Sequence, residues 1–148
     1  SLIRVYRAIK TMSIEHIVIE NGDALITRVT GQLTGEEMTE HMFWLIDNFG
    51  KRLNPGYRQL FDTTDMIDLS VNKSDINRIS QIIQTYGADR GKIKTGIVIT
   101  HPRGRQMAFT YQALSRVTDV DVKIYDTVEE AIGWLRIDPG ELPAGAFA

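Results

Sequence analysis

From residue 57 to residue 135, short apolar stretches alternate with longer stretches in which apolar residues recur at helical spacing. Residues 57–62 predict a central strand, and residues 95–100, with three consecutive β-branched apolar residues, predict a strand buried on both faces. Residues 122–125 supply one more short strand. Because a helix-length segment separates each of these strands from the next, the three should pair in parallel.

The N-terminal part of the chain predicts an antiparallel hairpin. Residues 15–20 and 23–30 are β-rich, and Asn21-Gly22 between them favours a two-residue type I′ turn. Together with the three later strands, the hairpin predicts an α/β fold with a small mixed sheet, which is antiparallel at its start and parallel afterwards.

Four helices are predicted from their start and stop signals. Capping boxes at residues 34–37 and 127–130 open the first and the last helix. Ser74 caps the second, and a turn at residues 101–105 leads into the third. Their C-terminal ends are expected near Phe49, Gly87, Val117 and Leu135.

Length and composition are those of a single globular domain. The chain has 148 residues, of which 43% are hydrophobic and 24% are charged, and this suits one packed core. We expect the domain to span residues 14–137. An arm or cloning remnant (residues 1–13) should precede it, and a flexible tail (residues 138–148) should follow.

Charge and residue types exclude several classes of function. The net charge of −2 argues against a nucleic-acid partner, and no apolar run approaches the roughly 20 residues that span a membrane. The chain has no cysteine, which excludes disulfides and thiolate metal sites and fits a cytoplasmic protein. His16 and His41 lie on different predicted elements, so we expect no metal site and no cofactor.

Polar residues follow two neighbouring strands, at the sheet edge where parallel folds bind ligands. Arg103 and Arg105 also flank a predicted helix N-terminus, whose free amides attract anions. The candidate site for a small anionic ligand or a partner's carboxylate consists of Asp62, Thr63, Asp65, His101, Arg103 and Arg105. The alternative, which we favour, is that the two arginines are solvated and pair with Asp62 or Asp65.

A general base at His101 would need Asp62 or Asp65 within hydrogen-bond reach. A lone histidine before a proline at a strand end more often caps a helix or strand, and no nucleophile lies beside it in the sequence. We therefore expect no enzymatic activity.

Several aromatic residues fall outside the core-facing stripes of the predicted helices. Gathered on adjacent helices, they would mark a surface for a protein partner or for self-association. They are Phe43, Trp44, Phe109 and Trp134. In the alternative arrangement, Met107, Phe109 and Tyr111 line an apolar pocket between the helices and the sheet.

The order and spacing of several short segments resemble the SpoIIAA-like family, which is related to STAS domains. The resemblance covers about residues 14–137. Besides the opening hairpin, it is carried by residues 30–34 (TGQLT), 60–62 (LFD), 96–98 (GIV) and 128–135 (VEEAIGWL). It implies a small mixed sheet with helices mainly on one side, and protein-interaction or small-ligand modules rather than enzymes.

The resemblance also raises the question of a phosphorylation switch. Anti-sigma-factor antagonists of that group are phosphorylated on a serine in an Asp-Ser-Ser-Gly motif. Residues 68–70 of this chain read Asp-Leu-Ser, with leucine at the acceptor position and no glycine after it. We therefore do not expect the same switch at Ser70 or Ser74.

The expected function is that of a cytoplasmic, non-enzymatic module that uses a helix face for protein contacts or regulation. The alternative is a carrier or sensor that holds a small apolar or anionic molecule in the crevice between helices and sheet. The SpoIIAA-like branch has been compared with lipid-carrier folds, which implies an apolar ligand. A flat apolar face would favour the first function, and a pocket closed to solvent would favour the second.

Overall fold

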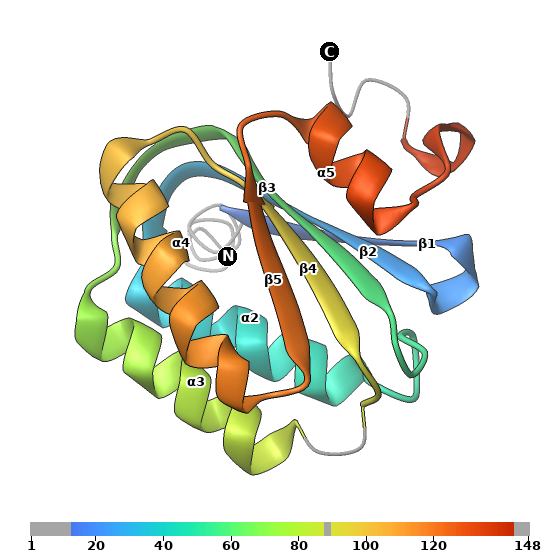
Figure 1. Ribbon diagram of the computed structural model, residues 1–148, viewed down its shortest axis with the longest axis horizontal. Coiled ribbons are helices and arrows are strands. Elements are labelled where there is room, and N and C mark those ends of the chain that lie inside the picture. Colours follow the sequence, from blue (N-terminus) through green and yellow to red (C-terminus); the bar gives the residue numbers. More distant parts are fainter. Residues whose placement is uncertain (1–12, 88–89, 144–148) are drawn as a thin grey trace, which may run out of the picture.

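The sheet of this protein is mixed and has five strands in the order β1-β2-β3-β4-β5 (Figure 1). The structure, a computed structural model, describes residues 13–87 and 90–143. The first two strands are antiparallel, and from the second onward each strand pairs in parallel with the next. This confirms the predicted fold class and pairing. The strands are β1 (Ile14–Ile19), β2 (Ala24–Thr34), β3 (Arg58–Ser70), β4 (Ile93–Val98) and β5 (Val120–Tyr125).

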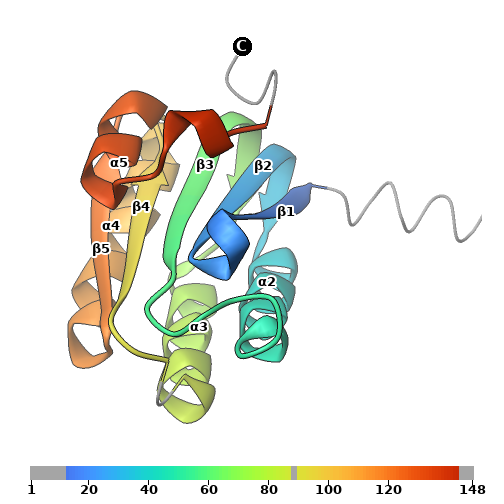
Figure 2. The same ribbon diagram turned by 90° about the vertical axis from the view of Figure 1, so that its right-hand side faces the viewer.

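The helices cover the two faces of the sheet unequally. They are α2 (Gly35–Asn48), α3 (Lys73–Tyr86), α4 (Pro102–Leu114) and α5 (Val128–Leu135). The first three lie on one face and α5 lies alone on the other (Figure 1 and Figure 2). Because strand side chains alternate between faces, Phe61 packs in the larger core under α2–α4, whereas its neighbour Leu60 packs in the smaller core under α5.

Two of the predicted helix caps are confirmed and one is wrong. Thr34 and Thr127 cap α2 and α5 as expected, each accepting a hydrogen bond from the backbone amide three residues later. The N-cap of α3 is Asn72 and not Ser74. The Asn72 side chain accepts from Asp75 N at 2.9 Å, and the Asp75 carboxylate accepts in return from Asn72 N at 3.0 Å. This reciprocal pair satisfies two free amides, which a Ser74 cap alone does not.

The third predicted helix is shorter than its periodicity indicated. α4 ends at Leu114 rather than near residue 117. Ser115–Val117 continue as a 3-10 turn, in which the Ser115 hydroxyl donates to Gln112 O at 2.8 Å. Helices commonly tighten in this way at their C-terminal ends.

β3 is longer than predicted. It runs to Ser70, whereas the sequence predicted a strand ending at Asp62 and a linker through residue 70. Past Asp62 it no longer pairs with β4 and pairs only with the end of β2. Half of the side chains at residues 63–70 are both polar and exposed, so neither an apolar run nor a regular alternation indicated a strand there. The β2–β3 extension, residues 30–34 and 63–70, bends toward the start of α4 (Figure 1).

The hairpin is confirmed, but its two-residue turn is wrong. Ile19 pairs with Ala24, so the loop contains the four residues 20–23. Glu20, Asn21 and Gly22 all have positive φ angles, of 51°, 55° and 96°. Tertiary contacts hold this wider loop, because the Arg58 guanidinium binds the Glu20 carboxylate at 2.8 Å.

The chain termini extend beyond the described residues. Residues 1–12 and 144–148 lie outside them, so the predicted N-terminal arm and the end of the predicted tail stay predictions. Pro139–Glu141 form a 3-10 turn, and Leu142 packs against the smaller core. Within residues 13–87 and 90–143, no helix has the length and apolar character to cross a membrane.

Candidate functional site

Asp62 and Thr63, predicted as ligand-binding residues, are buried in the middle of β3. The Asp62 carboxylate accepts hydrogen bonds from the backbone N and the hydroxyl of Thr64, the first at 2.9 Å. The Thr63 hydroxyl donates to Val98 O on the neighbouring strand at 2.6 Å. Both side chains therefore bond within the sheet rather than at an open rim.

Asp65 and Arg105, also predicted as ligand-binding residues, form separate surface ion pairs. Asp65 binds Arg28 on β2 at 3.5 Å. Arg105 binds Asp126 and donates to Ile99 O at 3.1 Å. The favoured interpretation expected Arg103 and Arg105 to pair with Asp62 or Asp65. Both do pair with carboxylates, but Arg105 binds Asp126 and Arg103 binds Asp68.

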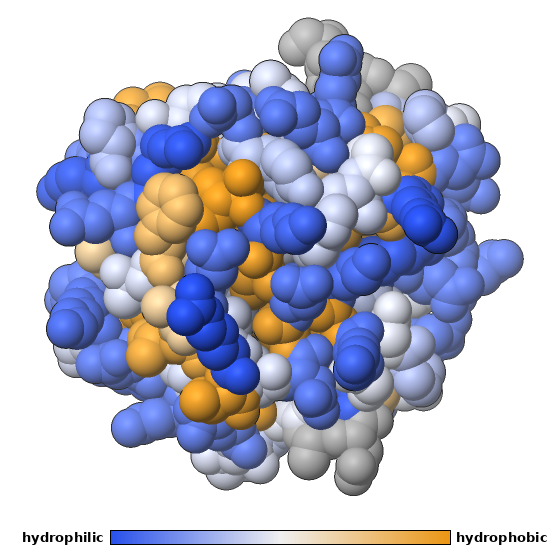
Figure 3. Space-filling view, viewed as in Figure 1, coloured by the Kyte–Doolittle hydropathy of each residue, from blue (hydrophilic) through white to orange (hydrophobic). Residues whose placement is uncertain are grey.

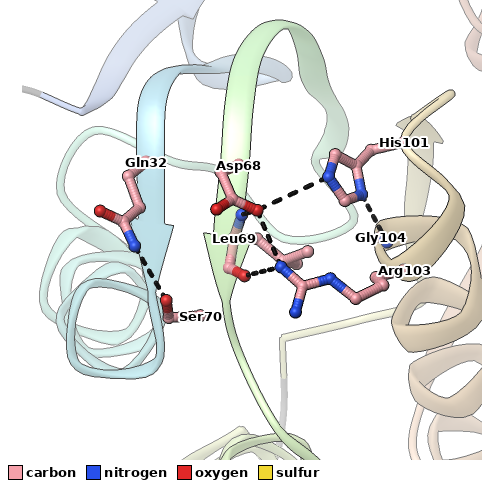
Figure 4. A network of polar contacts seen from close by, with 7 residues as sticks. All are labelled: Gln32, Asp68, Leu69, Ser70, His101, Arg103 and Gly104. Atoms are coloured by element: carbon pink, nitrogen blue, oxygen red, sulfur yellow. Dashed lines mark hydrogen bonds and ion pairs between the residues drawn. The ribbon is translucent and has the colours of Figure 1, made fainter.

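His101 and Arg103 meet at Asp68 on the β2–β3 extension (Figure 4). Arg103 binds Asp68 Oδ1 at 2.8 Å and Leu69 O at 3.0 Å. His101 Nε2 lies 3.6 Å from the same carboxylate oxygen, and its Nδ1 accepts from Gly104 N at 3.3 Å, which caps α4. A hydrogen bond from Leu69 N, followed by the one from Arg103, lowers the pKa of Asp68. The network ties the start of α4 to the β2–β3 extension, and His101 contacts Asp68 rather than Asp62 or Asp65.

A cavity of about 80 Å³ lies between the sheet and helices α2, α3 and α4. Its walls are mostly apolar side chains, including Met42, Ile79, Ile97 and Met107. The space is partly open to solvent, and a small apolar group that entered it would lose its contact with water.

A chain of buried polar groups reaches this cavity from β1. His16 Nε2 and His41 Nδ1 lie 2.7 Å apart. The other ring nitrogen of His41, Nε2, lies 3.1 Å from Gln59 Nε2. Gln59 Nε2 also donates to the Thr27 hydroxyl at 3.2 Å. With Gln59 as donor, His41 Nε2 is the acceptor and the shared proton sits on His41 Nδ1. His16 also stacks on Trp44, with ring centroids 3.8 Å apart.

Both histidines are held neutral. Burial, and next the positive charge of Arg52, lower the pKa of His16 to about 4. Burial, and next the neighbouring His16, lower the pKa of His41 well below its usual value. The sequence offered no sign of this pair, since 25 residues separate its members. In the part of the chain that the structure describes, no group of three or more potential ligands could hold a metal ion.

The four aromatic residues predicted as an interface do not form one patch. Trp44 stacks on His16. Trp134 lies on the opposite face of the sheet from the other three, and the amines of Lys94 and Lys123 lie 5.3 and 5.1 Å from the centre of its ring. Apolar side chains on the face shown in Figure 3 form a narrow band between α4 and α5, which hydrophilic side chains interrupt. The predicted surface of adjacent aromatics is therefore absent among these four residues.

Phe43 and Phe109 are exposed, but on different helices. Phe43 is 41% exposed and lies 6.0 Å from the Tyr86 ring on α3. Phe109 is 51% exposed beneath the Arg105 guanidinium. Of the alternative pocket residues, Met107 and Tyr111 line the cavity and Phe109 does not.

Comparison with known proteins identifies the fold. No protein-family model and no curated protein sequence matches the chain. One similar solved structure is that of an uncharacterized protein from Shewanella loihica PV-4, of the DUF3478 family and with a SpoIIAA-like fold. The match covers 82% of this chain and 91% of that protein's chain, with 16% sequence identity and a TM-score of 0.53. A candidate anti-sigma factor antagonist from Thermotoga maritima matches 86% of this chain and 97% of its own, with 19% identity and a TM-score of 0.54. The resemblance seen in the sequence is confirmed at the level of the fold: this chain has the SpoIIAA-like, STAS-related fold.

Proposed function

We propose that this chain is a cytoplasmic, non-catalytic STAS-like module that binds a small, largely apolar molecule in the cavity between the sheet and α2–α4. The observation that carries the proposal is the cavity itself. It lies inside the larger core, and nearly all the residues around it are buried. A pocket of this kind favours a carrier or sensor over a module that works only through a flat surface.

The polar residues support a binding role rather than a catalytic one. His101, Arg103 and Asp68 bond to one another and hold α4 in place. Their contacts position the helix that forms one wall of the cavity, since α4 supplies Met107 and Ala108 to the lining. The ion pairs therefore shape the pocket without entering it.

Native mass spectrometry of freshly purified protein tests the proposal. We expect a retained small molecule, or saturable binding of added alkyl compounds. The Ala108→Leu variant adds three carbon atoms to the cavity wall, so it should abolish that binding. It should also raise the stability of the ligand-free protein by about 1 kcal/mol, because the added atoms fill part of the void.

The matched control is Phe109→Leu, the next residue on α4, whose side chain points outward. This variant should bind as the wild type does. Equal binding by wild type and Ala108→Leu, or no binding of any alkyl compound by the wild type, would rule out the cavity as the site.

A second candidate function, contact with a protein partner or with a second copy, is favoured by Phe43 and Tyr86. These two exposed rings lie side by side on α2 and α3. Exposed aromatic pairs of this kind often anchor interfaces. If they do so here, Phe43→Glu should weaken self-association roughly thirtyfold, as expected for a hot spot of about 2 kcal/mol.

Sedimentation velocity measures this effect directly. Phe109→Glu, at an exposed aromatic on another helix, serves as the control and should associate as the wild type does. A monomer in all three proteins would eliminate self-association through these rings.

A further inference from the structure

One end of the cavity, where the parallel strands begin, is polar. Tyr57, Arg90 and Tyr111 line it there. Arg90 is only 6% exposed, and none of the described carboxylates lies within ion-pair distance of it. Its partners among the described residues are a carbonyl and a hydroxyl, so an anion that reached it would neutralise its charge.

The bonds that Arg90 does make leave most of its donors free. Its Nε donates to Gly87 O at 3.1 Å, at the C-terminus of α3, where the helix dipole offsets part of the charge. Its Nη1 donates to the Tyr57 hydroxyl at 3.3 Å. A guanidinium has five N–H groups, so about three of them have no acceptor among the described residues.

The two tyrosine hydroxyls add further donors. Tyr57 already accepts from Arg90, which leaves its own O–H free to donate. The Tyr111 hydroxyl has no hydrogen-bond partner among the residues that the structure describes. Burial, followed by the proximity of Tyr57, raises the pKa of Tyr111, so its proton stays in place. Among the described residues, this end of the cavity therefore offers guanidinium and hydroxyl donors to an acceptor carried by a ligand.

A surface hollow of about 500 Å³ meets the cavity at this point. The two spaces share four lining residues: Ile83, Arg90, Ile93 and Val120. Arg116 and Asp119 also line the hollow, and their charges are opposite. A small anion entering from solvent would reach the Arg90 guanidinium before the apolar interior.

We infer that the cavity takes an unbranched alkyl monocarboxylate, with the carboxylate bound by Arg90, Tyr57 and Tyr111 and the alkyl chain pointing toward α2 and the β2–β3 extension. The inference rests on the proposed function and adds the chemical class of the ligand. A carboxylate supplies the missing acceptors and neutralises the guanidinium in the bidentate geometry that arginine favours.

The size of the cavity favours a thin chain. A cavity of about 150 Å³ binds benzene, and this one has about 80 Å³. An unbranched chain needs less width than a ring, but hexanoate has more heavy atoms than benzene. Met38, Met42 and Met107 must therefore move to admit more than the first few carbons of the chain, and methionine side chains are flexible enough to do so.

Calorimetric titration of the full chain with hexanoate, and with hexanamide as its neutral counterpart, tests the inference. Hexanoate should bind saturably and at least about tenfold more tightly than hexanamide, because hydrogen bonds to a charged group are the stronger kind. Butanoate and octanoate then report the chain length that the cavity prefers. Acetate, which has the same head group without a chain, should bind much more weakly.

Two variants assign the head-group site. Tyr111→Phe removes one oxygen and should weaken hexanoate binding about tenfold while leaving hexanamide binding little changed. Arg90→Met should erase the preference for the carboxylate over the amide. In the wild type, the side-chain Nε–H resonance of Arg90 should move on addition of hexanoate.

The outcomes separate this inference from the proposed function. The carboxylate assignment would be wrong if hexanamide or hexanol bound as tightly as hexanoate. It would also be wrong if Tyr111→Phe and Arg90→Met kept the full preference for the carboxylate. Either result would leave the proposed apolar-ligand module intact. The absence of binding by all of these compounds, with no molecule retained on purification, would overturn both.

Discussion

Acidification from neutral pH to about pH 4 should destabilise the folded protein by on the order of 2 to 3 kcal/mol, with His16 and His41 as the main cause. In the folded state the pKa of His16 is lowered to about 4 from 6.5, and that of His41 is also lowered. The unfolded chain therefore binds protons first as the pH falls below 6.5, and the equilibrium shifts toward it. The loss should begin as the pH falls below about 6.5, and the part that is due to His16 should level off below about pH 4.

Urea unfolding at a series of pH values measures how steeply the free energy of unfolding falls as the pH is lowered. The double variant His16→Gln, His41→Gln should lose on the order of 1 to 3 kcal/mol at neutral pH, since the buried bonds are altered, and its stability should then change little down to about pH 4.5. His101→Gln removes the third histidine, which lies outside this network, and should keep the wild-type slope. The same slope in the double variant as in the wild type would show that other groups cause the acid loss.

The alternation of strands and helices could be predicted from the sequence because it depends on local signals. Apolar runs of strand length, capping boxes at Thr34 and Thr127 and helical periodicity all act within a few residues. The errors arose where distant contacts decide the structure. The loop at residues 20–23 is held open by Arg58, and the second half of β3 is a strand only because β2 runs beside it.

The proposed cavity follows from the sequence only in part, for a related reason. Met107 and Tyr111 were expected to line a pocket between helices and sheet, and they line the cavity. A rule for parallel sheets predicts a separate ligand site at the C-terminal ends of the strands, among charged residues that bond to one another. The cavity has its polar end at the opposite edge of the sheet, at Arg90 and Tyr57. An arginine in a loop gives no sign in the sequence that it will be buried with no described carboxylate within ion-pair distance. Likewise, only the packing of α2 against β1 brings His16 and His41 together.

Replacing Gly96 with valine should cost about 2 to 3 kcal/mol of stability, because Gly96 is where α5 packs directly on the sheet. A Cβ added at this position of β4 would lie 3.1 Å from Leu135 Cδ1 and 3.4 Å from Ala131 Cβ. Valine adds two more methyl groups, so α5 would have to move away from the smaller core. Urea unfolding of Gly96→Val gives the free energy, and Trp134 fluorescence reports the displacement of α5 itself.

Gly96→Ala is the matched control, because it adds only the Cβ. The atom that it approaches most closely is the end of the flexible Leu135 side chain, which can shift by a few tenths of an ångström. Alanine also restricts the unfolded chain, a gain of roughly 0.4 to 1 kcal/mol that offsets the tighter contact. The alanine variant should therefore remain within about 0.5 kcal/mol of the wild type.

Equal losses in the two variants would mean that the strand tolerates no side chain here at all. A negligible loss in Gly96→Val would mean that α5 is not packed against β4 at Gly96, which would remove the second layer from the fold.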